Sequence, residues 1–75
     1  MSAKEMFEKL GYAVVYTNDN GDIQYEKQFE YAKVIIYFVN KEKLIEMICD
    51  TEITYTIEFD ELQAINKQVE ELGWK

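Results

Sequence analysis

Residues 18–22, Asn-Asp-Asn-Gly-Asp, bring four polar side chains with oxygen atoms around one glycine. Carboxylate and amide oxygens are ligands for calcium, and an EF-hand loop has a glycine at its sixth position. Aligning Gly21 with that glycine puts Tyr16 at the first ligand position and Lys27 at the twelfth, where the motif has acidic residues. We therefore expect no metal here, and we interpret Asn20-Gly21 as the solvated tip of a β-hairpin.

Three other side chains have types that can carry chemistry: Lys27, Glu46 and Cys49. A buried lysine or carboxylate with a shifted pKa is a catalytic candidate. The alternative is that Glu46 lies on a second face of a sheet, while Lys27 extends its ammonium group past a sheet margin. Cys49 precedes Asp50, which disfavours a reactive thiolate, so we expect a small core side chain. No nucleophile–base pair or phosphate-binding loop is discernible, so we expect no catalytic residue and no cofactor.

The composition excludes several classes of function. The 75 residues include 15 acidic and 8 basic side chains, all of the latter lysine, for a formal net charge of −7. There is no histidine, arginine or proline, and one cysteine cannot form an internal disulfide. An acidic chain is poorly suited to nucleic acid or to an anionic membrane. With no long apolar run, we expect one cytoplasmic domain over residues 1–75.

Both ends of the chain are predicted to be helical. Ser2 and Glu5 form a capping box, and Gly11 ends the first helix. Its apolar stripe consists of Ala3, Met6, Phe7 and Leu10. Asp60 and Gln63 are predicted to cap the second helix, and Gly73 ends it. Its stripe consists of Leu62, Ile65, Val69 and Leu72.

The two helix ends, 7–12 and 69–74, have similar sequences. An internal duplication would explain this similarity. A shared stop signal explains it more simply, since the residue after the glycine packs back on the helix in a Schellman motif. We therefore expect Tyr12 to contact Phe7 and Trp74 to contact Val69. Core packing is also expected for Tyr16 and Tyr25, in preference to an aromatic ligand platform.

Between the helices the apolar pattern has period two, which predicts five strands. Their predicted ranges are 12–17, 23–29, 34–39, 44–49 and 53–59. The predicted cross-strand pairs are Tyr16 with Tyr25, Phe29 with Val34, Phe38 with Ile45, Ile36 with Met47, and Met47 with Tyr55. Short turns make sequential strands neighbours. The fold class is therefore predicted as α+β, a five-stranded antiparallel meander with the N- and C-terminal helices packed on one face.

The second face of this sheet is the most informative feature. Its outer strands are polar, as expected for a face in water. Its two middle strands instead present a cluster of large apolar side chains that only Glu46 interrupts. The cluster consists of Ile35, Tyr37, Val39, Leu44 and Ile48. β-Branched residues favour central strands in any case, but a cluster of this size predicts a contact surface.

The stretches 2–12, SAKEMFEKLGY, and 61–74, ELQAINKQVEELGW, together resemble the two ends of a family of small uncharacterised proteins. These proteins are encoded by phages, prophages and genomes of Gram-positive Firmicutes. The resemblance covers the whole length and is closest at the ends. It implies a cytoplasmic, phage-related origin, and it carries no activity and no functional residue over to this chain.

The leading hypothesis is a small non-enzymatic protein that binds another protein, or itself as a homodimer, through this apolar cluster. An alternative is an acidic decoy that occupies the basic groove of a nucleic-acid-binding protein, with binding that collapses in salt. A third possibility is an enzyme, which would need a deep pocket around Lys27 or Glu46. We expect no nucleic acid, membrane or small-molecule substrate as a partner.

Overall fold

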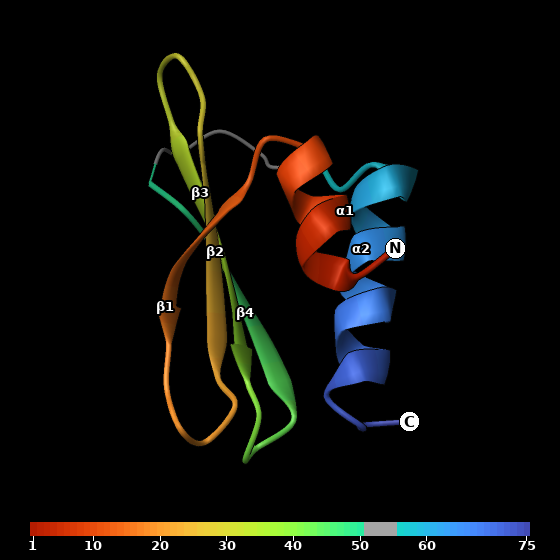
Figure 1. The fold of residues 1–75 in the computed structure, drawn as a ribbon. Helices are drawn as coiled ribbons and strands as arrows, with labels where there is room; N and C mark the ends of the chain where they lie inside the picture. Colours follow the sequence, from red (N-terminus) through yellow and green to blue (C-terminus); the bar gives the residue numbers. More distant parts are fainter. Residues whose placement is uncertain (51–55) are drawn as a thin grey trace.

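Helices from the two ends of the chain cover one face of an antiparallel sheet (Figure 1). The computed structural model describes residues 1–50 and 56–75. The elements are α1 (Ala3–Lys9), β1 (Ala13–Thr17), β2 (Ile23–Gln28), β3 (Lys33–Val39), β4 (Leu44–Cys49) and α2 (Phe59–Glu71). The strands lie side by side in the order β1-β2-β3-β4. The α+β class, the antiparallel sheet and both terminal helices are confirmed.

The predicted fifth strand, 53–59, is wrong over its described part. Residues 56–58 belong to no strand, and Phe59 is already the first residue of α2. Asp60 and Glu61 lie in the first turn, where carboxylates favour a helix N-terminus, and this preference overrides the period-two pattern. Asp60 is consequently not the cap; Glu58 occupies that position. Residues 53–55, with the predicted pairing of Met47 and Tyr55, lie outside the described residues.

The predicted start of α1 is confirmed. Glu5 N–H donates to Ser2 Oγ over 3.1 Å, and Ser2 N–H donates to Glu5 Oε1 over 3.0 Å. These bonds lower the pKa of Glu5 below its usual range. Ala3 N–H donates to Glu71 Oε2 over 2.8 Å, so a carboxylate of α2 satisfies another free donor of α1.

Both helices end in the predicted Schellman motif. Tyr12 N–H donates to the Phe7 carbonyl over 2.9 Å, and Trp74 N–H donates to the Val69 carbonyl over 3.1 Å. The glycine before each aromatic residue has a positive φ, 95° and 78° respectively. The Phe7 and Tyr12 rings meet edge to face with centroids 5.5 Å apart. The similarity of the two ends therefore has a sufficient explanation in this stop signal.

The predicted register is confirmed between β3 and β4, where Phe38 lies opposite Ile45. Between β2 and β3 it is wrong by two residues, because Val34 lies opposite Lys27 and not opposite Phe29. The chain turns earlier than predicted, as Phe29 N–H donates to the Ala32 carbonyl over 2.6 Å. A shift of two leaves every side chain on its predicted face.

The register between β1 and β2 is wrong in a way that does change faces. Val14, not Tyr16, lies opposite Tyr25, and a bulge at Val15 then places Tyr16 opposite Gln24. One extra residue in a strand reverses the face of the residues after it. Tyr16 therefore leaves the core side and is 46% exposed.

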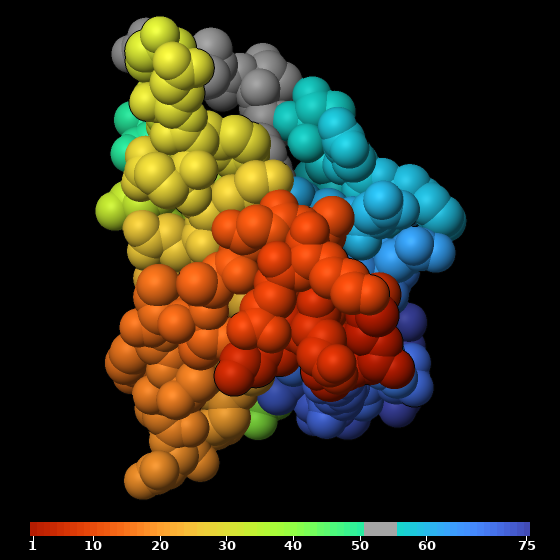
Figure 2. Space-filling view, turned by 45° about the horizontal axis from the view of Figure 1, so that its top comes forward, coloured from red at the N-terminus to blue at the C-terminus, as the bar shows by residue number. Residues whose placement is uncertain are grey.

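The core lies between the sheet and the two helices, and α1 packs in front of it (Figure 2). Its largest fully buried side chains are Tyr25, Phe7, Phe38, Ile36 and Val34. The rings of Phe7 and Tyr25 stack with centroids 4.0 Å apart. The Tyr25 hydroxyl donates to Gln68 Oε1 over 2.5 Å, and the Tyr12 hydroxyl to Glu61 Oε2 over 2.9 Å. Polar side chains of α2 thus satisfy both buried tyrosines.

Candidate interaction surface

The face of the sheet opposite the helices, the outer face, is covered by none of the described elements (Figure 1). β3 and β4 bring the five predicted surface residues together on it. Ile35 lies opposite Ile48, Val39 opposite Leu44, and Tyr37 opposite Glu46. The structure therefore groups all five predicted apolar residues on one face.

These side chains are partly accessible to solvent. Ile48 is 47% exposed and Leu44 is 39% exposed, while Ile35, Tyr37 and Val39 on β3 are half-buried. β3 has a neighbouring strand on each side, β2 and β4, whereas β4 has a neighbouring strand on one side only. The result is an apolar patch, interrupted by Glu46, whose most exposed part lies toward β4.

Tyr16 extends this patch across the sheet, which was missed from the sequence. Its ring meets that of Tyr37 edge to face, with centroids 6.2 Å apart. The bulge at Val15 is what brings it there. No glycine marks this bulge, so only the run of consecutive apolar residues at 13–16 offered a signal.

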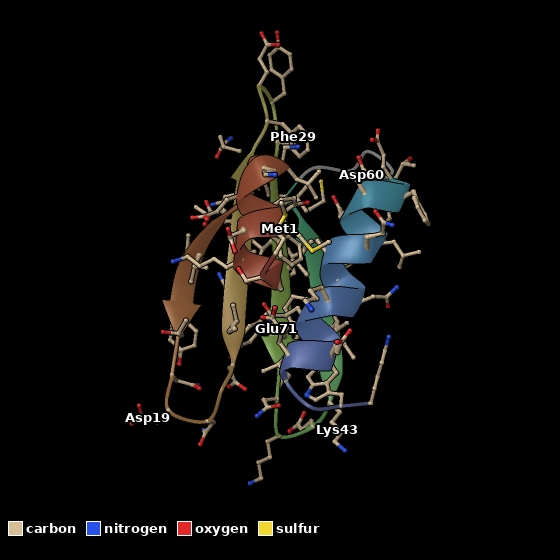
Figure 3. The ribbon with its side chains drawn as sticks, turned by 45° about the vertical axis from the view of Figure 1, so that its right-hand side comes forward. Met1, Asp19, Phe29, Lys43, Asp60 and Glu71 are labelled. Carbon is tan, nitrogen blue, oxygen red and sulfur yellow. The ribbon has the colours of Figure 1, made fainter. Side chains whose placement is uncertain are left out.

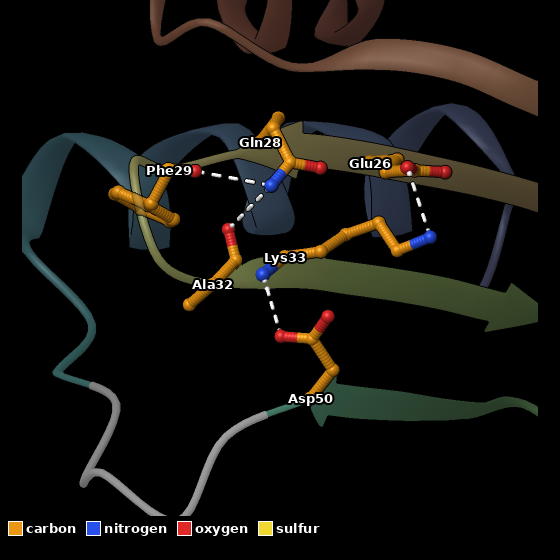
Figure 4. A network of polar contacts seen from close by, with 6 residues as sticks. All are labelled: Glu26, Gln28, Phe29, Ala32, Lys33 and Asp50. Carbon is orange, nitrogen blue, oxygen red and sulfur yellow. Dashed lines mark hydrogen bonds and ion pairs between the residues drawn. The ribbon is translucent and has the colours of Figure 1, made fainter.

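A polar network closes one end of the outer face (Figure 4). Lys33 Nζ lies 3.5 Å from Glu26 Oε1, and Lys33 N–H donates to Asp50 Oδ1 over 2.7 Å. Gln28 Nε2 donates to two carbonyl oxygens of the 29–32 turn. These hydrogen-bonded polar groups limit the apolar patch at this end of the sheet.

A second network closes the other end, where Asp19 and Lys43 mark the two neighbouring loops (Figure 3). The buried Asp22 carboxylate accepts hydrogen bonds from Asn18 Nδ2 at 2.9 Å and from Asn40 N–H at 2.8 Å. These bonds, that of Asn18 first, hold the pKa of Asp22 below its usual range. The Tyr37 hydroxyl donates to the same carboxylate over 3.4 Å, which orients its ring on the outer face. Burial, and then the Asp22 charge, raises the pKa of Tyr37.

The same network gives the side chains of Asn18 and Asp22 partners within the protein. Asn18 Oδ1 accepts from the N–H groups of Asn20 and Asp22, so it is directed at the loop itself. Asn40 Nδ2 donates to the Asn20 carbonyl, and Trp74 Nε1 donates to Asn40 Oδ1 over 2.7 Å. The described residues contain no cluster of metal-ligating side chains. The stretch joins two loops and the C-terminal segment.

Lys27 and Glu46, the two candidate catalytic residues, lie on opposite faces of the sheet. Glu46 is exposed on the outer face opposite Tyr37, whereas Lys27 lies opposite Val34 on the helix side. Lys27 Nζ lies 4.9 Å from the ring centroid of Phe29, a cation–π distance. The two side chains therefore cannot act on one substrate together.

Lys27 also lines a small hollow of about 120 Å³. The other lining residues are Leu10, Phe29, Glu58 and Glu61. Ligand pockets usually measure about 300–1,000 Å³, so this hollow does not give the enzyme hypothesis the deep pocket that it needs.

Comparison of the chain with protein-family models, with curated proteins and with solved structures gave no match. The resemblance to small phage-related proteins therefore stays a prediction. None of the helices among the described residues is long and apolar enough to cross a membrane.

Proposed function

We propose that this protein is a small non-enzymatic interaction domain that binds another protein through the outer face of its sheet. The observation that carries the proposal is the cluster of Ile35, Tyr37, Val39, Leu44 and Ile48 on a face that no described element covers. Apolar patches of this kind on small proteins are typical of contact surfaces.

Covering this patch contributes favourably to binding, residue by residue, against the free-energy cost of association. Burying a whole isoleucine side chain contributes roughly 1.5–3 kcal/mol, so covering the exposed half of Ile48 contributes about 1 kcal/mol. Leu44 and Tyr16 have similar exposed fractions, 39% and 46%. The β3 residues contribute less each, because the sheet already covers more of them.

Glu46 specifies the chemistry of the partner. It is the one charged side chain within the apolar cluster, and covering it with an apolar surface would cost more than the surrounding contacts contribute. A partner surface with one lysine or arginine opposite Glu46, surrounded by apolar side chains, satisfies both requirements.

The proposal is tested by capture of partners from a lysate of the source cell, using the double variant Ile35→Thr/Val39→Thr. These changes lie on β3 and remove apolar contacts while keeping β-branched side chains. Val15→Thr is the matched control, since Val15 is 48% exposed and lies on β1. A protein enriched by the wild type and by the control, but lost with the double variant, supports the proposal.

The salt dependence of the same capture separates this proposal from an acidic decoy. Apolar contacts persist in high salt, whereas binding driven by the net charge of −7 weakens steeply. A partner that is retained by the double variant and released by salt would contradict the outer-face proposal.

A further inference from the structure

β4 lies at an edge of the four-stranded sheet but has the composition of a central strand. Five of its six residues, Leu-Ile-Glu-Met-Ile-Cys, are apolar. Apolar side chains are exposed on both of its faces: Ile48 is 47% exposed on the outer face, and Met47 is 37% exposed on the helix side. Edge strands usually carry charged side chains, prolines or bulges that discourage pairing with another chain, and of these β4 has one charged side chain, Glu46.

The opposite edge of the sheet differs in this respect. β1 is interrupted by the bulge at Val15, which twists the strand and breaks its regular row of backbone groups. β4 pairs with β3 without interruption from Leu44 to Cys49. Of the two edges, only β4 is a regular template for a further strand.

The alternation of hydrogen bonds along β4 shows which of its backbone groups point toward the open edge of the sheet. Asp50 N–H donates to the Lys33 carbonyl over 3.1 Å. In an antiparallel ladder hydrogen-bonded pairs alternate, so Ile48 and Glu46 also bond toward β3. The N–H and C=O groups of Met47 and Ile45 therefore point toward the open edge, where none of the described residues pairs with them.

We propose that this edge binds a second copy of the chain, with two β4 strands pairing antiparallel about a twofold axis at Met47. Such symmetry requires one residue to lie opposite its own copy, because the axis preserves the face of every side chain. An axis at Glu46 would place the Cβ atoms of two glutamates about 5 Å apart, and like charges directly opposite one another are unfavourable. A twofold axis at Ile45 would shorten the paired length of the two β4 strands and place Met47 of one copy opposite Lys43 of the other.

The Met47 register has favourable neighbours on both faces. Met47 meets its copy on the helix side, where 37% of its surface is otherwise in water. On the outer face Glu46 lies opposite Ile48 of the second copy, so no like charges are opposed. The pairing places Glu46 and Ile48 beside the second copy, but the β3 residues of the outer face remain uncovered and available to the proposed partner.

The charge of the chain gives the pairing a characteristic response to salt. Each copy carries a formal net charge of −7, so the two copies repel one another. Salt screens this repulsion and leaves backbone and apolar contacts in place. The dimer is therefore expected to tighten as ionic strength rises.

The first test is disulfide cross-linking in a Cys49→Ala background, where an introduced cysteine is the only thiol. With oxidised glutathione, Met47→Cys is expected to form a covalent dimer at least tenfold faster than Glu46→Cys. Residues opposite their own copy lie within disulfide reach, whereas Glu46 is displaced from its copy along the strands. Equal rates for the two variants, or faster reaction of Glu46→Cys, would overturn the register.

The second test is molar mass in solution by light scattering over a dilution series. The wild type is expected at twice the chain mass of 8.9 kDa, Met47→Lys at the chain mass, and the control Val15→Lys still at twice that mass. A wild-type monomer throughout, or a dimer that survives Met47→Lys, would overturn the proposal. Loss of the dimer only in Ile35→Thr/Val39→Thr would also overturn it, and would place self-association on the outer face.

Discussion

Replacing Tyr25 by phenylalanine removes one hydroxyl from the junction between α2 and the sheet. Tyr25 is 1% exposed and Gln68 is 3% exposed, and the bond between them is 2.5 Å long. Without the hydroxyl, Gln68 Oε1 stays buried and loses this donor. An unsatisfied buried acceptor costs about 1–3 kcal/mol. In a chain of this length, each kcal/mol lowers the melting temperature by about 4–8 °C.

The measurement is urea and thermal unfolding of Tyr25→Phe beside a matched control, Tyr31→Phe. Tyr31 is 83% exposed in the 29–32 turn, so its change is expected to alter stability by less than about 0.5 kcal/mol. The double variant Tyr25→Phe/Gln68→Met removes both partners together. It is expected to lose less stability than the sum of the two single changes, with a coupling of at least about 0.5 kcal/mol. Equal stability of Tyr25→Phe and the wild type, or strict additivity, would refute the role of this bond.

Alkaline pH provides a second readout of the same group. Burial, and then the nearby Glu71 and Glu8 charges, raises the pKa of Tyr25 to about 12. The unfolded chain ionises this tyrosine near pH 10, so the stabilising effect of the neutral group is complete below about pH 10. It is lost as the pH rises toward about 12. The stability difference between wild type and Tyr25→Phe is therefore expected to shrink across that window.

The remaining predictions concern the loops. Asp22→Asn is expected to destabilise the fold at neutral pH and to remove part of its acid sensitivity, as measured by unfolding from pH 7 to pH 2. Because the pKa of Asp22 is lower in the folded protein, its ionised carboxylate stabilises the fold at pH values above the unfolded pKa of about 3.9. This stabilisation is lost as the pH falls through the pKa of Asp22 in the folded protein. An acid-unfolding profile of Asp22→Asn identical to that of the wild type would contradict this role of Asp22. Gly11→Ala is expected to cost more than Gly73→Ala, which itself costs about 1 kcal/mol. Both glycines have a positive φ, but a Cβ at Gly11 would also lie 3.2 Å from Lys27 Cε, whereas the space around Gly73 is open. Equal losses of unfolding free energy in the two variants would refute the effect of this contact.

The parts of the fold that sequence reasoning predicted correctly depend on neighbouring residues along the chain. The Ser2–Glu5 capping box and the two glycine stops each involve residues within six positions. The β3–β4 register was predicted from the short turn at 41–42, which fixes Phe38 opposite Ile45. The outer-face cluster was predictable because β3 is apolar at almost every position, so it presents apolar side chains on both faces of the sheet.

The failures arise where distant contacts decide between two acceptable local choices. Val14 and Tyr16 are both apolar, and only packing against α1 and β2 selects Val14 for the core side. The start of α2 was misplaced because alternation over 53–59 also fits a strand. The burial of Glu61 and Gln68 depends on where α2 lies over the sheet, which no local pattern encodes.

Site-specific photo-cross-linking tests most directly whether the outer face contacts a protein partner. Benzoylphenylalanine would replace Tyr37 on the outer face and, as control, Tyr31, which is 83% exposed and lies away from the cluster. In the source cell, position 37 is expected to yield a discrete cross-linked protein that position 31 does not yield. No product from position 37, or the same product from both positions, would contradict the account.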